Sequence, residues 1–343
     1  MKKIMPQLVG NRALAERLGG EILSGGMSHA YIIAGDKGSG KHTLARLIAA
    51  SLACESKKNE DAPLPCNVCE SCRKILTGIS PDVITVGTED RATLGVETIR
   101  NLRLDILTHP NDLDIKVYII EDADKMTVQA QNAFLLTLEE PPPYVLFLLL
   151  CERPKELLET IRSRAPIIRT EPVSSEEIAK FLEKDETMQS LKNDSPDEFF
   201  EVVMAAFGRI GQALALCDPE VRSEILLARS HAKSFVLSAA KRSGGAALID
   251  IIQAFPQARA ELAERLSLIA LALRDLALLK KSEDAPLCFY YDREAAIELS
   301  YSFTLSAIMT LISHCESARL AVLRNANIKL TLTNLVMRGN YGK

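Results

Sequence analysis

A glycine-rich loop near the start of the chain joins an apolar run to a helix-like stretch, and this junction most constrains the fold. The run AYIIAG (30–35) leads into DKGSGK (36–41), and KHTLARLIAASLAC (41–54) continues with a helical apolar pattern. Four further apolar runs, PDVITVG, IKVYIIED, YVLFLLLC and RAPIIRT, alternate with helix-like segments. Near-continuous apolar strands separated by helices predict an α/β domain, with a parallel sheet covered on both faces, over about residues 1–170.

Beyond residue 170 the strand-like runs stop. The segment PVSSEEIAKFLEK places Ser174 three residues before Glu177, which is the capping-box pattern at the start of a helix. Residues 171–218 therefore predict a small helical domain, and residues 219–343, which are helical in pattern almost throughout, predict an all-α bundle.

Composition excludes several broad classes. The chain has 343 residues and a net charge of −4, which argues against a protein that coats nucleic acid through bulk charge. The first residues lack the apolar core of a signal peptide, and no run of 18 apolar residues occurs, so neither export nor a membrane span is expected. A cytoplasmic protein is the expectation.

The glycine loop matches the phosphate-loop pattern G-x-x-x-x-G-K, with Gly38 as a third glycine inside it. Gly35, Gly40 and Lys41 fit, but His42 stands where Ser or Thr would place a hydroxyl on Mg²⁺. Thr43 is not a substitute, because one residue along a helix turns the side chain by about 100°. The loop is thus a nucleotide site by ancestry, and the alternative for His42 is a partly exposed residue capping an unused loop.

Two acidic residues follow the apolar run KVYII. Glu121 and Asp122 stand where a Walker B carboxylate would hold Mg²⁺ and its neighbour would orient water, although the usual order is Asp then Glu. The alternative is an ordinary acidic end of a strand.

Four of the eight cysteines cluster in the pattern C-x11-C-x2-C-x2-C, formed by Cys54, Cys66, Cys69 and Cys72. Thiolates at this spacing can converge on one ion, and four of them complete a closed tetrahedral structural zinc site. Free thiols and an iron–sulfur cluster are the alternatives. The scattered Cys151, Cys217, Cys288 and Cys315 are typical of buried small apolar residues.

These motifs together resemble the bacterial clamp-loader subunits of DNA polymerase III, within the AAA+ class. The matching strings are SHAYIIAGDKGSGK, PCNVCESCRKI, PDVITV, GVETIRNLR, KVYIIEDADKMTVQAQNAFLLTLEEPP, ERPKELLETIRSRA and NANIKLTLTNLVMR. They occur in the family's order over nearly the whole chain. The resemblance implies an AAA+ phosphate-loop domain over 1–170 with a zinc module at about 54–72, a lid domain at 171–218 and a collar domain at 219–343.

Within this family, four altered positions favour the delta-prime type over the gamma/tau motor type. The motor subunits resemble this chain but carry Thr at the position of His42, Asp-Glu at Glu121 and Asp122, Thr at Cys151, and Arg at Gly211. A thiol forms weaker hydrogen bonds than a hydroxyl, and loss of the Arg removes a bidentate phosphate clamp. We therefore expect a defective ATPase in this chain itself, with binding of ATP or ADP in doubt.

A delta-prime role implies a scaffold in a five-membered ring with gamma/tau and delta subunits, which loads the sliding clamp onto primed DNA. The family's Ser-Arg-Cys motif, which presents an arginine finger to a neighbour's ATP, is matched by Ser163 and Arg164, with Ala165 in place of Cys. The finger role is therefore carried to Arg164. Two alternatives stay open: a motor subunit that hydrolyses ATP itself, and an unrelated zinc-stabilised nucleic-acid-binding protein.

Overall fold

The structure is a computed structural model that describes residues 3–88, 92–241 and 245–338. Its contacts divide the chain into two units. Unit 1 comprises Met1–Glu177 together with Gly208–Gly211, and unit 2 comprises Ile178–Phe207 and Gln212–Lys343.

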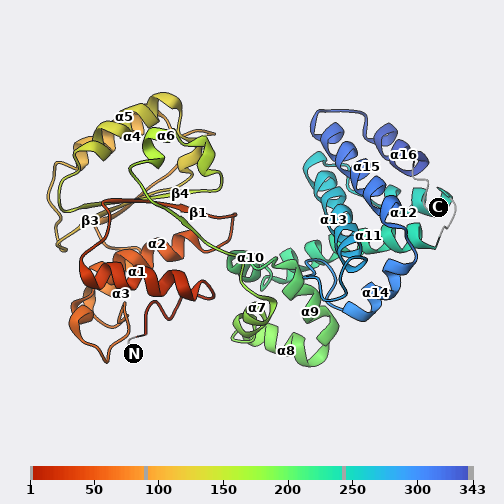
Figure 1. Ribbon diagram of the computed structural model, residues 1–343, viewed down its shortest axis with the longest axis horizontal. Helices are drawn as coiled ribbons and strands as arrows, with labels where there is room; N and C mark the ends of the chain where they lie inside the picture. The colour runs from red at the N-terminus through yellow and green to blue at the C-terminus, as the bar shows by residue number, and fades with distance from the viewer. Residues whose placement is uncertain (1–2, 89–91, 242–244, 339–343) are drawn as a thin grey trace. The chain divides into compact units, whose positions relative to one another are not determined.

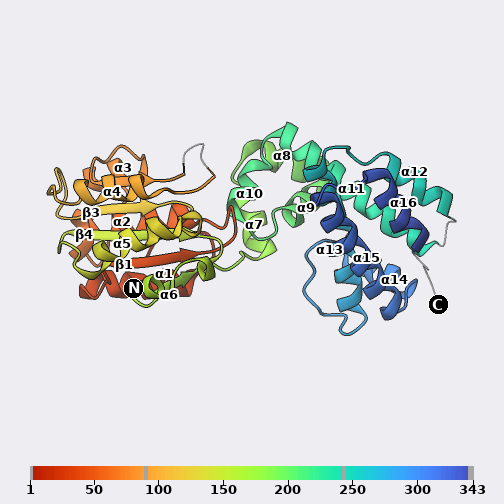
Figure 2. The ribbon, with the colours of Figure 1, turned by 90° about the horizontal axis from the view of Figure 1, so that it is seen from above.

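Unit 1 is built on a five-stranded sheet in the order β2-β3-β4-β1-β5, and every described pair of strands is parallel. In Figure 2 the strands β3, β4 and β1 run side by side. The strands are β1 (Ala30–Ala34), β2 (Val83–Val86), β3 (Lys116–Ile120), β4 (Val145–Cys151) and β5 (Ile167–Arg169). Each coincides with one of the five apolar runs, so the predicted parallel sheet is confirmed.

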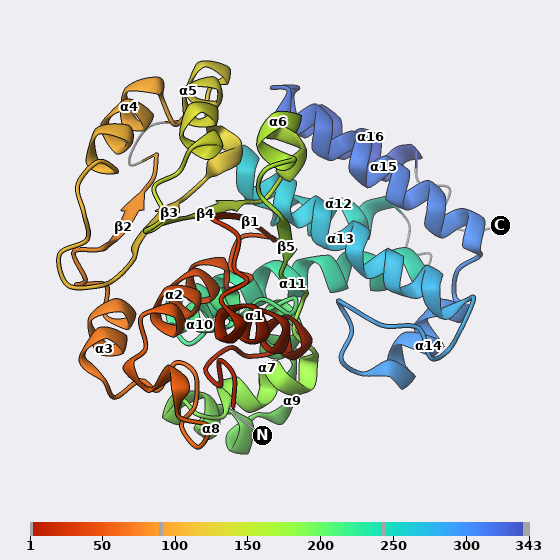
Figure 3. The same cartoon turned by 60° about the vertical axis from the view of Figure 1, so that its left-hand side comes forward.

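Side chains that alternate along each strand fill two separate cores, one on each face of the sheet. On one face, Ile33 and Leu150 pack with helices α1, α2 and α3, and on the other, Ile32 and Phe147 pack with α4, α5 and α6. Figures 1 and 3 show these two groups of helices on opposite sides of the strands. Because both faces are covered, the central strands are apolar at nearly every position.

The helices of unit 1 follow the strands in alternation, as a parallel sheet requires. They are α1 (Arg12–Ser24), α2 (Lys41–Leu52), α3 (Glu70–Leu76), α4 (Val96–Asp105), α5 (Val128–Glu139) and α6 (Glu159–Arg162), with the 3-10 turns η1 (Glu55–Lys58), η2 (Ala123–Lys125) and η3 (Pro154–Glu156).

The remaining elements are all helices. Ser174 caps α7 as predicted: its Oγ accepts from the N–H of Glu177 at 3.3 Å and donates to that residue's carboxylate at 3.1 Å. These helices are α7 (Ser175–Leu182), α8 (Glu186–Asp194), α9 (Pro196–Ala205), α10 (Ile210–Ala215), α11 (Pro219–Ala240), α12 (Gly245–Gln253), α13 (Arg259–Leu279), α14 (Arg293–Tyr301), α15 (Leu305–Leu323) and α16 (Ile328–Arg338).

Helix α13 forms the centre of unit 2, where it packs against α11, α14 and α15. Figure 1 shows α13 alongside α15. Asp275 and Arg229 are two of the charged side chains that are buried in this core. Asp275 accepts from the N–H groups of Cys288 and Phe289 at 2.8 and 2.6 Å, while Arg229 pairs with Glu201 and donates to the carbonyl of Phe289. These two buried charges are tolerated because each side chain forms hydrogen bonds.

Among the described residues, no single helix is both long and apolar enough to span a membrane. Helices α14 and α15 meet the criterion of length and composition only when taken together, as a pair bent by 102°.

Candidate functional site

The phosphate loop lies between the end of β1 and the start of α2, as the sequence predicts. Gly38 and Gly40 have φ angles of 80° and 88°, a left-handed conformation that glycine adopts without steric cost. Helix α2 begins at Lys41, directly after Gly40. The N–H of Gly35 donates to the carbonyl of Cys151 at 3.1 Å, which ties the loop to the end of β4. The loop therefore stands between a strand and a helix, as the phosphate-loop pattern requires.

Lys41 is folded back onto its own loop. Its Nζ donates to the carbonyl oxygens of Gly35 and Asp36 at 2.6 and 2.9 Å, and the residue is 8% exposed. Burial lowers the pKa of Lys41, while the nearby carboxylates of Glu152, Asp124 and Asp36 oppose that shift. A phosphate would have to draw the ammonium away from these carbonyls.

His42 and Glu121 meet directly. His42 stands in the first turn of α2, Glu121 follows the last residue of β3, and the two side chains approach with Nδ1 3.1 Å from Oε1. The contact is an ion pair only when the imidazole is protonated, because a neutral ring carries no charge. The two residues at the positions where a motor subunit would supply metal ligands thus contact each other.

Thr43 and Asp122, which also belong to the predicted nucleotide site, do not contact this pair. Thr43 is exposed on α2. Asp122 has a left-handed φ of 49°, accepts from the hydroxyl of Thr88 at 3.3 Å and forms an ion pair with Lys125 at 3.1 Å. Neither side chain joins His42 and Glu121.

These residues do not fit Mg²⁺. The ion needs small oxygen ligands in a near-octahedral shell at about 2.0–2.1 Å, and imidazole suits other metals better. At the position of the missing hydroxyl, the structure presents an imidazole nitrogen that lies 3.1 Å from the carboxylate of Glu121.

Cys151 and Gly211, the other two altered positions, lie against the loop. Cys151 ends β4 opposite Ala34 of β1 and is 1% exposed, and burial raises the pKa of its thiol to about 12. The N–H of Gly211 donates to the carbonyl of Gly38 at 2.8 Å. A Cβ added at Gly211 would lie 2.8 Å from the Cα of Gly38. The backbone at Gly211 thus packs where a side chain would need space.

Replacing Gly211 by Ala is expected to destabilise unit 1 by about 1–3 kcal/mol, because the new methyl group would press on the backbone of the loop. Urea unfolding followed by circular dichroism measures this change. The matched control is Gly20→Ala in α1, where an added Cβ meets nothing within 4 Å and the helix gains about 1 kcal/mol. A Gly211→Ala protein as stable as the parent chain would contradict the close packing.

The four clustered cysteines converge. The sulfur atoms of Cys54, Cys66, Cys69 and Cys72 all lie within 4.8 Å of one another. Four thiolates around one zinc ion at 2.3 Å would be about 3.8 Å apart, so the group is close to a tetrahedral arrangement. The cluster could therefore bind a metal, with a donor set that suits zinc.

Backbone N–H groups donate hydrogen bonds to two of these sulfur atoms. Cys69 caps α3, with its Sγ accepting from the N–H of Cys72 at 3.5 Å, and the N–H of Cys69 donates to the Sγ of Cys66 at 3.4 Å. Burial works against ionisation of Cys66, but N–H groups from Cys69 and Val68 outweigh it and hold its pKa at about 6. Burial raises the pKa of Cys54 and of Cys72. One ready thiolate thus lies beside thiols that a cation would deprotonate.

Arg164 lies at the end of the turn that follows α6. Its Nη2 forms an ion pair with Oε1 of Glu139 at 2.9 Å, and its Nη1 donates to the carbonyl of Thr160 at 3.1 Å. The side chain is 37% exposed. The next residue, Ala165, which replaces the family's Cys, is fully buried against the sheet. The turn therefore anchors its backbone through Ala165 while the guanidinium remains accessible.

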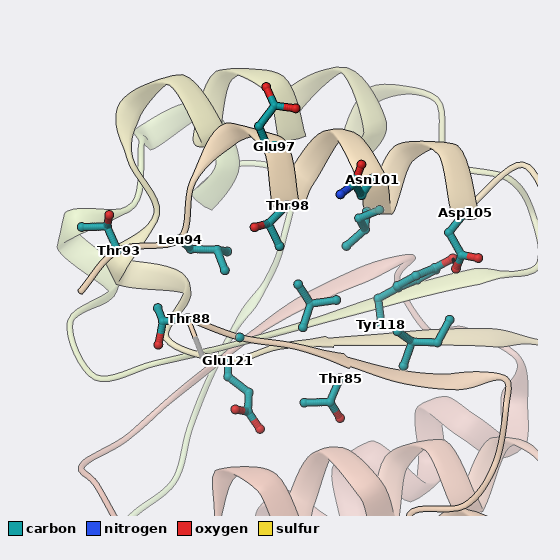
Figure 4. A pocket seen from close by; sticks show the side chains of 14 residues that line it. Thr85, Thr88, Thr93, Leu94, Glu97, Thr98, Asn101, Asp105, Tyr118 and Glu121 are labelled. Atoms are coloured by element: carbon teal, nitrogen blue, oxygen red, sulfur yellow. Dashed lines mark hydrogen bonds between the residues drawn. The ribbon is translucent and has the colours of Figure 1, made fainter. Parts of the chain in front are cut away.

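A cavity of about 700 Å³ lies between α4 and β2, away from the phosphate loop. Figure 4 shows Thr98 and Asn101 of α4 facing the strands across it, with Glu121 directed to the opposite side of the strands. Asp105 accepts from the hydroxyl of Tyr118 at 2.6 Å within its lining. Glu97, Asp105 and Glu121 are among its lining residues, although the side chain of Glu121 points away from it across the strands.

Three contacts of the candidate residues were not predicted from the sequence. They are the pairing of His42 with Glu121, that of Arg164 with Glu139, and the backbone bond between Gly211 and Gly38. The lengthened carboxylate at Glu121 was a signal for the first of them. The other two join residues that are distant in sequence, and no local pattern announces them.

Comparisons with known proteins agree with the geometry of unit 1. Residues 10–174 match a family described as "DNA polymerase III, delta subunit". DNA polymerase III subunit tau of Bacillus subtilis is 31% identical over 62% of this chain and 37% of its own length. Subunit tau of Escherichia coli is 32% identical over 63% and 33%, and subunit gamma of Buchnera aphidicola from Acyrthosiphon pisum 31% over 62% and 57%. The chain thus spans between a third and somewhat over half of these relatives' lengths.

A solved structure of a gamma subunit-related protein from Thermotoga maritima aligns over 94% of this chain and 97% of that one. The identity is 17% and the TM-score 0.45. Residues 10–174 are therefore similar to a DNA polymerase III delta-type domain, and the chain is similar in sequence to tau and gamma subunits of DNA polymerase III.

Proposed function

We propose that this chain is a non-motor, delta-prime-like subunit of the DNA polymerase III clamp loader. In this role it acts as a scaffold in a ring with gamma/tau and delta subunits, which loads the sliding clamp onto primed DNA in the cytoplasm. The relation of residues 10–174 to clamp-loader subunits supports the general assignment. Its nucleotide loop supports the more specific one.

One observation carries the non-motor assignment: the Nδ1 of His42 lies 3.1 Å from the carboxylate of Glu121. In a working site these two positions would hold Mg²⁺ through a hydroxyl and a carboxylate. Without the ion, the charge that develops on the γ-phosphoryl group in the transition state lacks its main stabiliser. The chain's own loop therefore does not hydrolyse ATP.

Arg164 supplies the second part of the proposed function, an arginine finger for the ATP of a neighbouring subunit. A guanidinium has five N–H donors, and two hydrogen bonds are formed here, to Glu139 and to the carbonyl of Thr160. The contact with Glu139 is exposed and therefore worth at most about 1 kcal/mol. A phosphoryl group presented by a neighbour would displace it readily.

The remaining regions have structural roles in this proposal. Cys54, Cys66, Cys69 and Cys72 hold one structural zinc ion, which supplies no chemistry because four thiolates leave no open position. Residues 171–218 form the lid domain, and residues 219–343 form the collar through which the subunits assemble.

The alternative is a gamma/tau-like motor subunit, which the identity of 31–34% to subunits of that type favours. ATP turnover separates the two proposals. The isolated chain is expected to show no magnesium-dependent hydrolysis of ATP, whereas a complex reconstituted with motor and delta subunits hydrolyses ATP and loads the clamp. Magnesium-dependent turnover by the isolated chain, abolished in Lys41→Ala, would establish the motor alternative.

A further inference from the structure

The misfit between the phosphate loop and Mg²⁺ has a definite form. His42 lies in α2 and Glu121 directly follows β3. His42 differs in donor type, and Glu121 in length, from the residues that a magnesium site needs at these positions. The structure brings their polar atoms to 3.1 Å.

We propose that the contact between His42 and Glu121 takes the place of the divalent cation, so that nucleotide phosphates bind this loop no more tightly with Mg²⁺ than without it. This inference rests on the part of the proposed function in which the loop does not hydrolyse ATP. It goes further because it assigns the loss of metal dependence to two named side chains and concerns binding rather than turnover.

The exclusion of the cation follows from the types of atom that the two side chains present. An imidazole offers a cation no oxygen ligand, and Nδ1 of His42 faces the carboxylate of Glu121 at 3.1 Å. A Ser or Thr hydroxyl at the same position would donate its proton elsewhere and still present oxygen to the ion. The contact is open to solvent, with side chains 56% and 35% exposed, so the exclusion comes from the missing oxygen rather than from the strength of the pair.

Within the described residues, no neighbouring group restores the ligand. Asp122 is held by Lys125 and Thr88, and Thr43 is turned away along α2. The group of His, Cys, Asp and Glu side chains that the described part of the chain brings together for a metal is the cysteine cluster instead. The affinity that the loop retains for phosphates would come from Lys41 and from the loop N–H groups at the start of α2.

Calorimetric titration of the full chain with ATP and with ADP tests the proposal, in the presence of Mg²⁺, of Co²⁺, or of EDTA. Zinc content is checked before and after titration. For the unmodified chain, we expect dissociation constants that agree within about twofold between Mg²⁺ and EDTA. For the double variant His42→Thr, Glu121→Asp, which restores hydroxyl and short carboxylate, we expect binding to tighten about tenfold with Mg²⁺.

The matched control is His42→Ala with Glu121→Asp, which removes the imidazole without adding a hydroxyl and is expected to gain no response to Mg²⁺. A tenfold effect of Mg²⁺ on the unmodified chain would overturn the proposal. A comparable effect of Co²⁺ would also overturn it, because the imidazole would then serve as a ligand. If the unmodified chain binds neither nucleotide, the double variant decides: failure to gain magnesium-dependent binding, with its melting curve intact, refutes the proposal.

These results are distinguishable from failure of the proposed function. Magnesium-enhanced binding without hydrolysis would overturn this inference and leave the non-motor role standing. Hydrolysis by the isolated chain would overturn the non-motor role itself.

Discussion

Replacing Arg164 by Ala is expected to lower hydrolysis at the neighbouring ATP site of the assembled complex by about 10³-fold or more. The guanidinium would place positive charge and two hydrogen bonds on the transferring phosphoryl group, and Ala supplies neither. Single-turnover hydrolysis by the reconstituted complex, with clamp and primed DNA present, measures the loss. Clamp loading should fall with it.

The stability of the chain should hardly change in this variant. The ion pair of Arg164 with Glu139 is exposed and contributes at most about 1 kcal/mol. Melting of the isolated Arg164→Ala chain should therefore resemble that of the parent, so a loss of turnover in the complex would not reflect unfolding.

Two further variants sharpen this test. Arg162→Ala removes the neighbouring basic residue, whose Nε donates to the carbonyl of Leu157 within the chain, and should leave turnover nearly unchanged. Arg164→Lys keeps the charge but loses the planar fork, and should recover only a small part of the rate. Normal hydrolysis and loading by the Arg164→Ala complex would remove the finger assignment.

Replacing Cys72 by Ser is expected to abolish stoichiometric zinc and to destabilise unit 1 by on the order of 3–5 kcal/mol, a fraction of the binding energy that structural zinc contributes to folding. Cys72 is fully buried and shares a core with α2 and the sheet, so loss of the ion would disturb the layer beneath the phosphate loop. Elemental analysis of freshly purified, reduced protein should find one zinc per chain before the substitution, and thermal melting measures the destabilisation.

The control for this variant is Cys217→Ser, a partly exposed cysteine of unit 2 that lies outside the cluster. It should retain one zinc per chain and melt close to the parent. A parent chain that is fully folded without metal, or a Cys72→Ser chain that keeps its zinc, would refute a structural metal site at this cluster.

The fold of unit 1 was largely predictable from local patterns. Five apolar runs became five parallel strands because each run is buried on both faces and carries its pattern within a few residues. The capping box at Ser174 and Glu177 formed for the same reason, since both partners lie three residues apart. The division of the helical part into a lid and a collar remains a prediction.

The sequence predicted which residues belong to the candidate site, but not which of them contact each other. The spacing of the glycines and of Lys41 predicted the loop, and the spacing of the four cysteines predicted their cluster. The side chain of Asp122 points to Lys125 rather than to His42 because its backbone is left-handed. The sequence at this position does not predict that backbone conformation.

By itself, the sequence determined which chemical groups this chain brings to its phosphate loop, its cysteine cluster and the turn at Arg164. Only the tertiary structure decided which of these groups contact each other. Residues 42 and 121, or 139 and 164, or 38 and 211, are joined by the packing of helices on a sheet, which local propensity does not encode. The imidazole therefore faces a carboxylate where Mg²⁺ would stand, while the guanidinium remains accessible at the surface.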